Sequence, residues 1–173
     1  MLLDEGVDTG AMLLKSSRLL DDTVTGGALF DLLAADGAEL LSRTLDALQA
    51  GTLEPTPQPE EGACYASMLD KSMCPLDWHK PARTLHNQVR GMNPWPVANC
   101  RLDGKVTKVF VTRVGESTDA AAGTVVAVQP LTIACGDGCT LIIDELQAEG
   151  SRRMPATDYL RGHPVAVGTN LCE

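Results

Sequence analysis

Acidic side chains, two glycines and a threonine lie close together in the opening segment Asp4–Gly10 of this 173-residue chain. Gly6 and Gly10 can adopt backbone conformations with positive φ, so the segment is predicted to be a tight loop that holds its carboxylates in defined positions. A carboxylate held in this way can accept or orient a proton during a reaction. The local pattern also fits a solvated turn ahead of a strand.

A second uncommon string, Asn93-Pro94-Trp95-Pro96, lies far downstream and follows Leu85–Arg90. Three further motifs accompany these two, namely Thr23–Gly26, Leu76–Trp78 and Gly136–Gly138. In this order, and together with the opening loop, the motifs resemble the methionyl-tRNA formyltransferase family over the whole chain. Any one of them would be a weak signal, but their combined order and spacing make the resemblance strong.

The resemblance implies a catalytic role for Asp8, which in the family works with a histidine to orient a water and move protons. It also implies that the opening loop lines the folate site. The predicted folate-lining residues are Leu3, Asp4, Glu5, Gly6, Val7 and Asp8. The expected formyl donor is 10-formyltetrahydrofolate, and the expected acceptor is the amino group of methionine on initiator tRNA.

The family's Asn-x-His arrangement and its Ser-Leu-Leu-Pro loop do not occur in this sequence. The three histidines are His79, His86 and His163, and each is predicted to be a surface or capping residue. By the resemblance Met1 corresponds to an interior position of the family. We therefore expect a C-terminal portion of a formyltransferase, or a late start, that is inactive by itself.

The fold class expected is an α/β remnant, the end of a Rossmann-like formyltransferase domain, followed by an all-β OB-like barrel with short helices. Residues 1–50 would be the remnant, 51–66 a Pro-rich linker and 67–173 the tRNA-binding domain. In the remnant we expect a strand over Ala11–Lys15, then two helices separated near Gly37, the first capped by Asp21–Thr23.

The second domain is predicted to contain a helix over Pro81–Arg90, five short strands and a final helix over Met154–Arg161. Asp103-Gly104 is typical of a two-residue hairpin turn. The predicted strands are Asn99–Leu102, Lys105–Arg113, Gly123–Val128, Leu131–Cys135 and Thr140–Gln147.

The net charge of −9 arises entirely from residues 1–66, whereas residues 83–113 carry six basic residues and a single acid, Asp103. Such a basic span indicates a nucleic-acid-binding face, although a solvated surface gives the same pattern. Trp95, between two prolines, is predicted to be a rigid core or interdomain plug. The predicted tRNA-contact residues are Arg83, Arg90, Arg101, Lys105, Lys108 and Arg113, with Arg152 and Arg153 as a second group.

Composition restricts the class of protein. No apolar stretch reaches the roughly 18–20 residues of a membrane span, and the N-terminus lacks the pattern of a secretory signal. The six cysteines have no metal-ligand spacing with the histidines, so reduced thiols, no metal and a cytoplasmic monomer are expected. Two alternatives stay open: a formyltransferase acting on an amino sugar, and a stand-alone RNA-binding module without catalysis.

Overall fold

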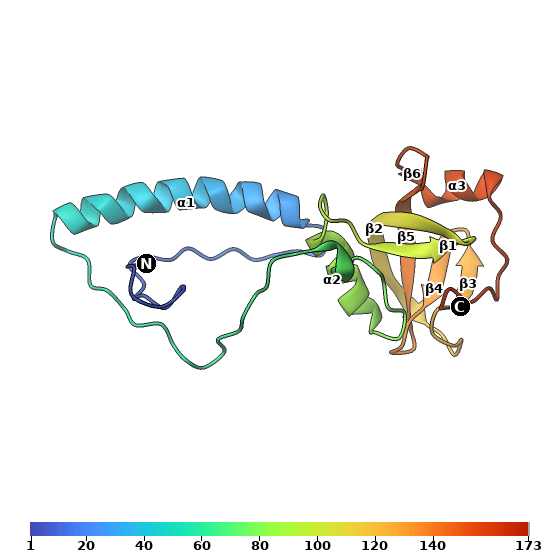
Figure 1. Cartoon of the computed structure of the whole chain (residues 1–173), viewed down its shortest axis with the longest axis horizontal. Coiled ribbons are helices and arrows are strands. Elements are labelled where there is room, and N and C mark those ends of the chain that lie inside the picture. The colour runs from blue at the N-terminus through green and yellow to red at the C-terminus, as the bar shows by residue number, and fades with distance from the viewer. Residues whose placement is uncertain (173) are drawn as a thin grey trace. The chain divides into compact units, whose positions relative to one another are not determined.

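The computed structural model describes residues 1–172, shown in Figure 1. Its contacts divide the chain into two compact units. The first unit comprises Met1–Asp21 and Ala28–Met68. The second unit comprises Asp22–Gly27 and the residues from Leu69 onward. The short segment Asp22–Gly27 therefore belongs to the second unit although the residues on both sides of it belong to the first.

The first unit is built around one long helix, α1 (Gly26–Gln49), whose first two residues lie in the second unit. The prediction of two helices was wrong, because α1 continues without interruption through Gly37. No residue of α1 is buried, so its own backbone hydrogen bonds contribute more to the helix than core packing does.

The predicted strand over Ala11–Lys15 is absent. In its place Met12 makes an isolated antiparallel bridge to Thr56, with both backbone N–H···O distances at 2.8 Å. This bridge joins the opening segment to the Pro-rich segment that follows α1. Proline lacks a donor N–H, so alternate prolines at 55, 57 and 59 limit the pairing to a single bridge.

The second unit contains a six-stranded antiparallel sheet in which β1–β5 run in the order β1-β2-β5-β4-β3, while the short β6 pairs with β5. The strands are β1 (Asn99–Leu102), β2 (Lys105–Ser117), β3 (Val125–Val128), β4 (Leu131–Ala134), β5 (Cys139–Ala148) and β6 (Met154–Pro155). All five predicted strands exist, and only β6 was missed. Register shifts interrupt the pairing of β2 with β5, and such bulges bend a sheet into the curled form seen in Figure 1.

Helix α2 (Ala82–Gly91) packs on β2 and β5, and α3 (Ala156–Gly162) packs on β5 and β6. A 3-10 turn, η1 (Lys71–Met73), precedes α2 and is capped by Asp70, whose carboxylate accepts from Ser72 N at 2.6 Å. The hydrophobic core lies between these helices and the sheet. Its largest fully buried side chains include Leu85, Leu131 and Leu141.

Turn residues act where the sequence predicts. Asp103 (φ 51°) and Gly104 (φ 71°) form the two-residue turn between β1 and β2, where both central residues must have positive φ. Between β4 and β5, the Asp137 carboxylate accepts from Cys139 N and also from Ala82 N, each at 3.2 Å. The hairpin thus satisfies a free N–H at the start of α2.

Candidate functional site

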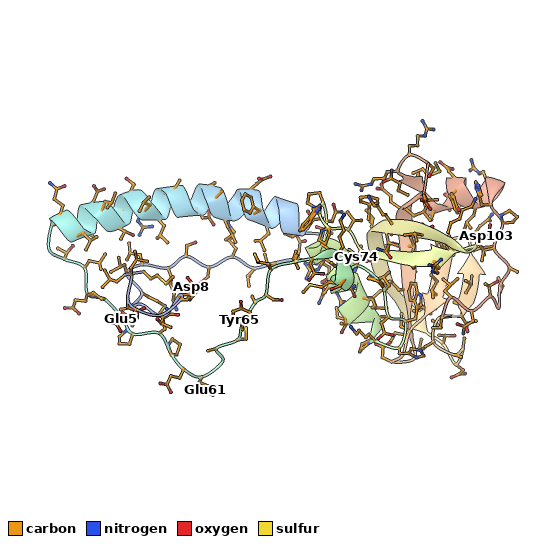
Figure 2. All side chains as sticks on the ribbon, in the orientation of Figure 1. Glu5, Asp8, Glu61, Tyr65, Cys74 and Asp103 are labelled. Carbon is orange, nitrogen blue, oxygen red and sulfur yellow. The ribbon has the colours of Figure 1, made fainter. Side chains whose placement is uncertain are left out.

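The opening loop is organised by Asp4 rather than by Asp8. Asp4 Oδ1 accepts from Thr9 Oγ1 at 2.5 Å and from Gly6 N at 3.1 Å. Asp8 has a left-handed backbone (φ 58°), and Gln58 Nε2 donates to its carbonyl at 2.7 Å. Figure 2 shows Glu5 and Asp8 on this loop. Asp4, predicted as part of the folate loop, therefore gives the loop its shape.

Asp8 and the three histidines belong to different units of the chain. Asp8 belongs to the first unit, while His79, His86 and His163 all belong to the second. Over residues 1–172 no group of three His, Cys, Asp or Glu side chains is arranged to hold a metal ion. No cysteine within residues 1–172 forms a disulfide, and burial raises the pKa of Cys100 and Cys135 to about 12, so these two stay protonated at neutral pH.

A cavity of about 380 Å³ in the second unit brings together three of the predicted RNA contacts, Arg83, Arg90 and Arg113. They come from two elements, α2 and β2, and the start of the 22–27 segment forms another wall. Apolar side chains of β2, including Phe110 and Val114, line part of the cavity. Three of the six basic residues of the span 83–113 thus line one recess, together with apolar side chains.

His86 was predicted to be a surface or capping residue, and it does not lie at the surface, because only 6% of it is exposed. Its Nδ1 lies 3.0 Å from Thr112 Oγ1, and its Nε2 lies 3.0 Å from the carbonyl oxygen of Asp22. A carbonyl can only accept, so Nε2 carries the proton and donates it. His86 therefore fastens the 22–27 segment to α2 and β2.

Three further contacts hold the same segment. Arg83 Nη1 pairs with Asp22 Oδ2 at 2.6 Å, Arg90 Nη1 donates to the carbonyl of Val24 at 3.3 Å, and Gly27 N donates to the carbonyl of Asn93 at 2.9 Å. The hydrogen bond from Arg83 lowers the pKa of the Asp22 carboxyl below its usual value. Asp22 therefore pairs with α2, whereas α1 begins four residues later at Gly26.

Close packing explains the glycines at this point. A Cβ on Gly26 would lie 2.3 Å from the carbonyl oxygen of Gly91, and one on Gly27 would lie 2.6 Å from Pro94 Cδ. Asn93 is buried and its Nδ2 donates to the carbonyl of Phe110 at 3.1 Å. Asn93 and Pro94 thus form the seat on which the start of α1 rests.

The remaining predicted contacts lie outside the cavity. Arg101, Lys105 and Lys108 are exposed on the β1–β2 hairpin, and Arg101 donates to the carbonyl of Gly104 at 3.2 Å. Arg152 and Arg153 are exposed between β5 and β6, with Arg153 Cζ 4.5 Å from the centre of the Phe110 ring. The structure therefore separates the predicted set into a cavity group, a hairpin group and a β5–β6 group.

The two tryptophans lie in different environments, and the core position predicted for Trp95 is wrong. Trp78 is buried at 2% exposure, whereas Trp95 is 59% exposed and is not a core plug. Both prolines that flank Trp95 follow cis peptide bonds. Leu76 and Trp78, from the motif noted ahead of α2, supply the core contacts instead.

Comparison with known proteins fits this architecture. The family model for the formyl transferase C-terminal domain matches residues 68–164. The chain belongs to this family. It carries the family's C-terminal domain, and the matched residues include the sheet and all three of η1, α2 and α3.

Two relatives of this chain carry the same name. The methionyl-tRNA formyltransferase of Pelobacter propionicus is 46% identical over 173 residues, which are 99% of this chain and 54% of that protein. The enzyme of the same name from Acetivibrio thermocellus is 45% identical over 175 residues, 99% of this chain and 56% of that protein. The chain spans about half the length of the curated relatives it matches.

Solved structures share its fold. An N-formyltransferase from Helicobacter canadensis, bound to folinic acid and dTDP-3-aminofucose, is 18% identical with a TM-score of 0.64, over 84% of this chain and 53% of that one. HypX from Aquifex aeolicus in complex with tetrahydrofolic acid is 19% identical with a TM-score of 0.61, over 91% of this chain and 28% of that one. No helix within residues 1–172 is both long and apolar enough to cross a bilayer.

Proposed function

We propose that this formyl transferase chain serves methionyl-tRNA formylation, in which a formyl group passes from 10-formyltetrahydrofolate to the amino group of methionine on initiator tRNA. The observation that carries the proposal is the 46% identity to a methionyl-tRNA formyltransferase over 99% of the chain. The fold family alone is less specific, since a solved N-formyltransferase of the same fold holds an amino sugar nucleotide. We propose that the protein works as a cytoplasmic monomer.

We assign a separate role to each of three parts of the chain. Residues 1–50 would be the end of a Rossmann-like catalytic domain, 51–66 a linker and 67–173 an OB-like tRNA-binding domain. Asp8 would be the catalytic aspartate. The backbone of Leu3–Asp8 would line the folate pocket, with Asp4 shaping the loop through its bonds to Gly6 and Thr9. A buried histidine, His86, cannot assist Asp8 while it holds Thr112 and Asp22.

The tRNA contacts would come from the cavity group Arg83, Arg90 and Arg113, joined by the two exposed groups. Exposed basic side chains supply the sequence-independent attraction to phosphates. The exposed lysines of the hairpin, Lys105 and Lys108, are best suited to that first attraction, because no ion pair within residues 1–172 holds them. The half-buried Arg90 is held by Asn87 and Val24 and would mainly support the cavity wall.

The test joins this chain to the N-terminal half of the Pelobacter propionicus relative. We expect the isolated chain to bind initiator tRNA in a salt-dependent way without formylating it, and the fusion to formylate Met-tRNA. Asp8→Asn in the fusion should abolish turnover with little change in tRNA affinity, whereas Asp31→Asn, an exposed acid of α1, should leave both unchanged.

Two results would contradict the proposal. Turnover by the isolated chain with 10-formyltetrahydrofolate would show that Asp8 needs no partner from outside these residues. A fusion that folds and binds tRNA but formylates an amino sugar nucleotide in preference to Met-tRNA would favour the sugar-modifying alternative.

A further inference from the structure

Three arginines of the predicted RNA-contact set hydrogen-bond carboxylates of other elements or segments, at sequence separations of 8, 31 and 61 residues. Arg113 Nε and Nη2 donate to the two oxygens of Asp144, each at 2.8 Å. Arg153 Nε donates to Glu145 Oε2 at 2.7 Å. The third pair is Arg83 with Asp22 at 2.6 Å. We call Asp22, Asp144 and Glu145 the masking carboxylates.

The other exposed cations of the set have no such partner. Among residues 1–172, Arg101, Lys105, Lys108 and Arg152 take part in no ion pair. Seven of the eight predicted contacts therefore divide into two kinds of charge, and the eighth, Arg90, is held by Asn87 and Val24. One kind is open to any anion, and the other is already occupied by an anionic group of the protein.

The occupied arginines stay within reach of solvent. The side chain of Arg113 is 60% exposed, that of Arg83 52% and that of Arg153 46%. Exposed ion pairs are weak, so an incoming phosphate can displace the carboxylate. A phosphate presents the same geometry to a guanidinium as a carboxylate does, and it can take both N–H donors of one fork.

Displacement nevertheless requires the phosphate to arrive in the right position. Arg113 is held by two parallel hydrogen bonds, which also raise the pKa of its guanidinium. Arg153 is fixed from a second side by the Phe110 ring, 4.5 Å from Cζ. A polyanion that binds in many registers seldom places a phosphate where it can replace the carboxylate. Arginines that are held in this way therefore add little to its affinity.

We propose that the masking carboxylates are specificity-determining residues, which lower the affinity of the basic surface for arbitrary polyanions more than for the RNA whose phosphates fit it. The proposal rests on the proposed function, since it takes the surface to be an RNA contact. An acidic protein with a net charge of −9 gains selectivity if its arginines respond only to a phosphate in register.

The test compares Asp22→Asn, Asp144→Asn and Glu145→Gln with a matched control, Asp158→Asn, in the full chain. Asp158 pairs with Arg161 on α3, so the control removes the same charge and also frees an arginine, but one outside the predicted set. Dissociation constants are measured for poly(U) and for initiator tRNA at several salt concentrations.

We expect each masking variant to bind poly(U) about two- to fivefold more tightly than the control does. The logarithmic salt dependence should steepen by about 0.7 for each arginine freed. Affinity for initiator tRNA should rise less, so discrimination between the two RNAs should fall. In an Arg113→Gln background, Asp144→Asn should raise the affinity for poly(U) no more than Asp158→Asn does.

Weaker poly(U) binding by the variants would overturn the proposal, because it would mean that the carboxylates orient the arginines for phosphate. Poly(U) affinities equal to that of Asp158→Asn would also overturn it, since net charge would then explain the whole effect. Failure of the proposed function would give a different result. No variant would then prefer initiator tRNA to poly(U), but the masking variants would still bind poly(U) more tightly than the control.

Discussion

The leucines of the first unit and those of the second lie in contrasting environments. In α1, Leu33, Leu41 and Leu45 are 50%, 60% and 57% exposed, whereas Leu85 and Leu141 of the second unit are fully buried. Every residue of the hydrophobic core comes from position 74 onward. Helical periodicity therefore predicts a helix, but its apolar residues stabilise the fold only when they pack against a second surface.

The same contrast applies to the two candidate sites. The opening loop, with Asp8, is held by hydrogen bonds among exposed groups and by Gln58. The arginine cavity rests on α2 and β2, whose inner faces are part of the core. We therefore expect the geometry of the cavity to survive changes that alter the loop.

Hydrogen exchange should give the largest difference between the two units. Core amides of β2 and β5 should exchange slower than those of residues 1–21 and 50–68 by a factor of about 10³ or more, because they open only with global unfolding. Amides within α1 should fall between, since they are bonded within the helix without tertiary cover. Exchange of the opening segment as slow as that of β5 would contradict the comparison.

Core truncation should come next in size. Leu141→Ala removes a fully buried side chain and should lower the free energy of unfolding by about 3 kcal/mol. Leu41→Ala, on exposed α1, should change it by less than about 0.5 kcal/mol. Urea unfolding followed by fluorescence of the buried Trp78 measures both. Equal losses would show that the α1 leucines are packed in solution.

The seat of the 22–27 segment can be tested with two glycines. Gly26→Ala should cost about 1–3 kcal/mol, because its Cβ would collide with the carbonyl oxygen of Gly91. In Gly37→Ala the added Cβ meets open space within α1. This change should stabilise the helix by up to about 1 kcal/mol and so raise the helix content. Urea unfolding reports the first change and far-UV circular dichroism the second. If Gly26→Ala left the free energy of unfolding unchanged, the packing of Gly26 against the carbonyl of Gly91 would not be tight.

The hairpin cap should give the smallest effect. Asp137→Ala removes the acceptor for the N–H groups of Ala82 and Cys139 and should cost about 1 kcal/mol. Asp119→Ala removes an exposed acid from the β2–β3 connection as a control. The midpoints of thermal unfolding of the two variants are compared. Equal decreases in both would show that the Asp137 carboxylate does not stabilise the start of α2.

Much of the second unit could be predicted because its signals are local. Asp103-Gly104 predicted the turn at which β1 ends, β1 has its predicted bounds, and α2 is displaced by only one residue from its prediction. The bulged end of β2 beyond Arg113 and the two-residue β6 were missed. Neither leaves a pattern in the residues, since both depend on pairing with β5.

The first unit was harder to predict because its residues have few neighbours to restrain them. Gly37 reads as a break, yet a glycine inside a helix costs only about 1 kcal/mol, which a 24-residue helix tolerates. Asp21–Thr23 reads as a helix cap, but Asp22 instead meets Arg83, 61 residues away in sequence. No pattern of neighbouring residues can indicate a contact over that separation.

The sequence by itself determined the family resemblance, the loop around Asp8 and the turns that order the sheet, because each depends on residues that are adjacent in the chain. Tertiary structure alone decided that His86 is buried against Thr112, that Trp78 and not Trp95 enters the core, and that Arg83, Arg113 and Arg153 meet carboxylates. Those outcomes depend on side chains brought together by strand pairing and helix packing. Charge along the chain predicted a basic span, and folding determined which of its charges are free to attract an anion.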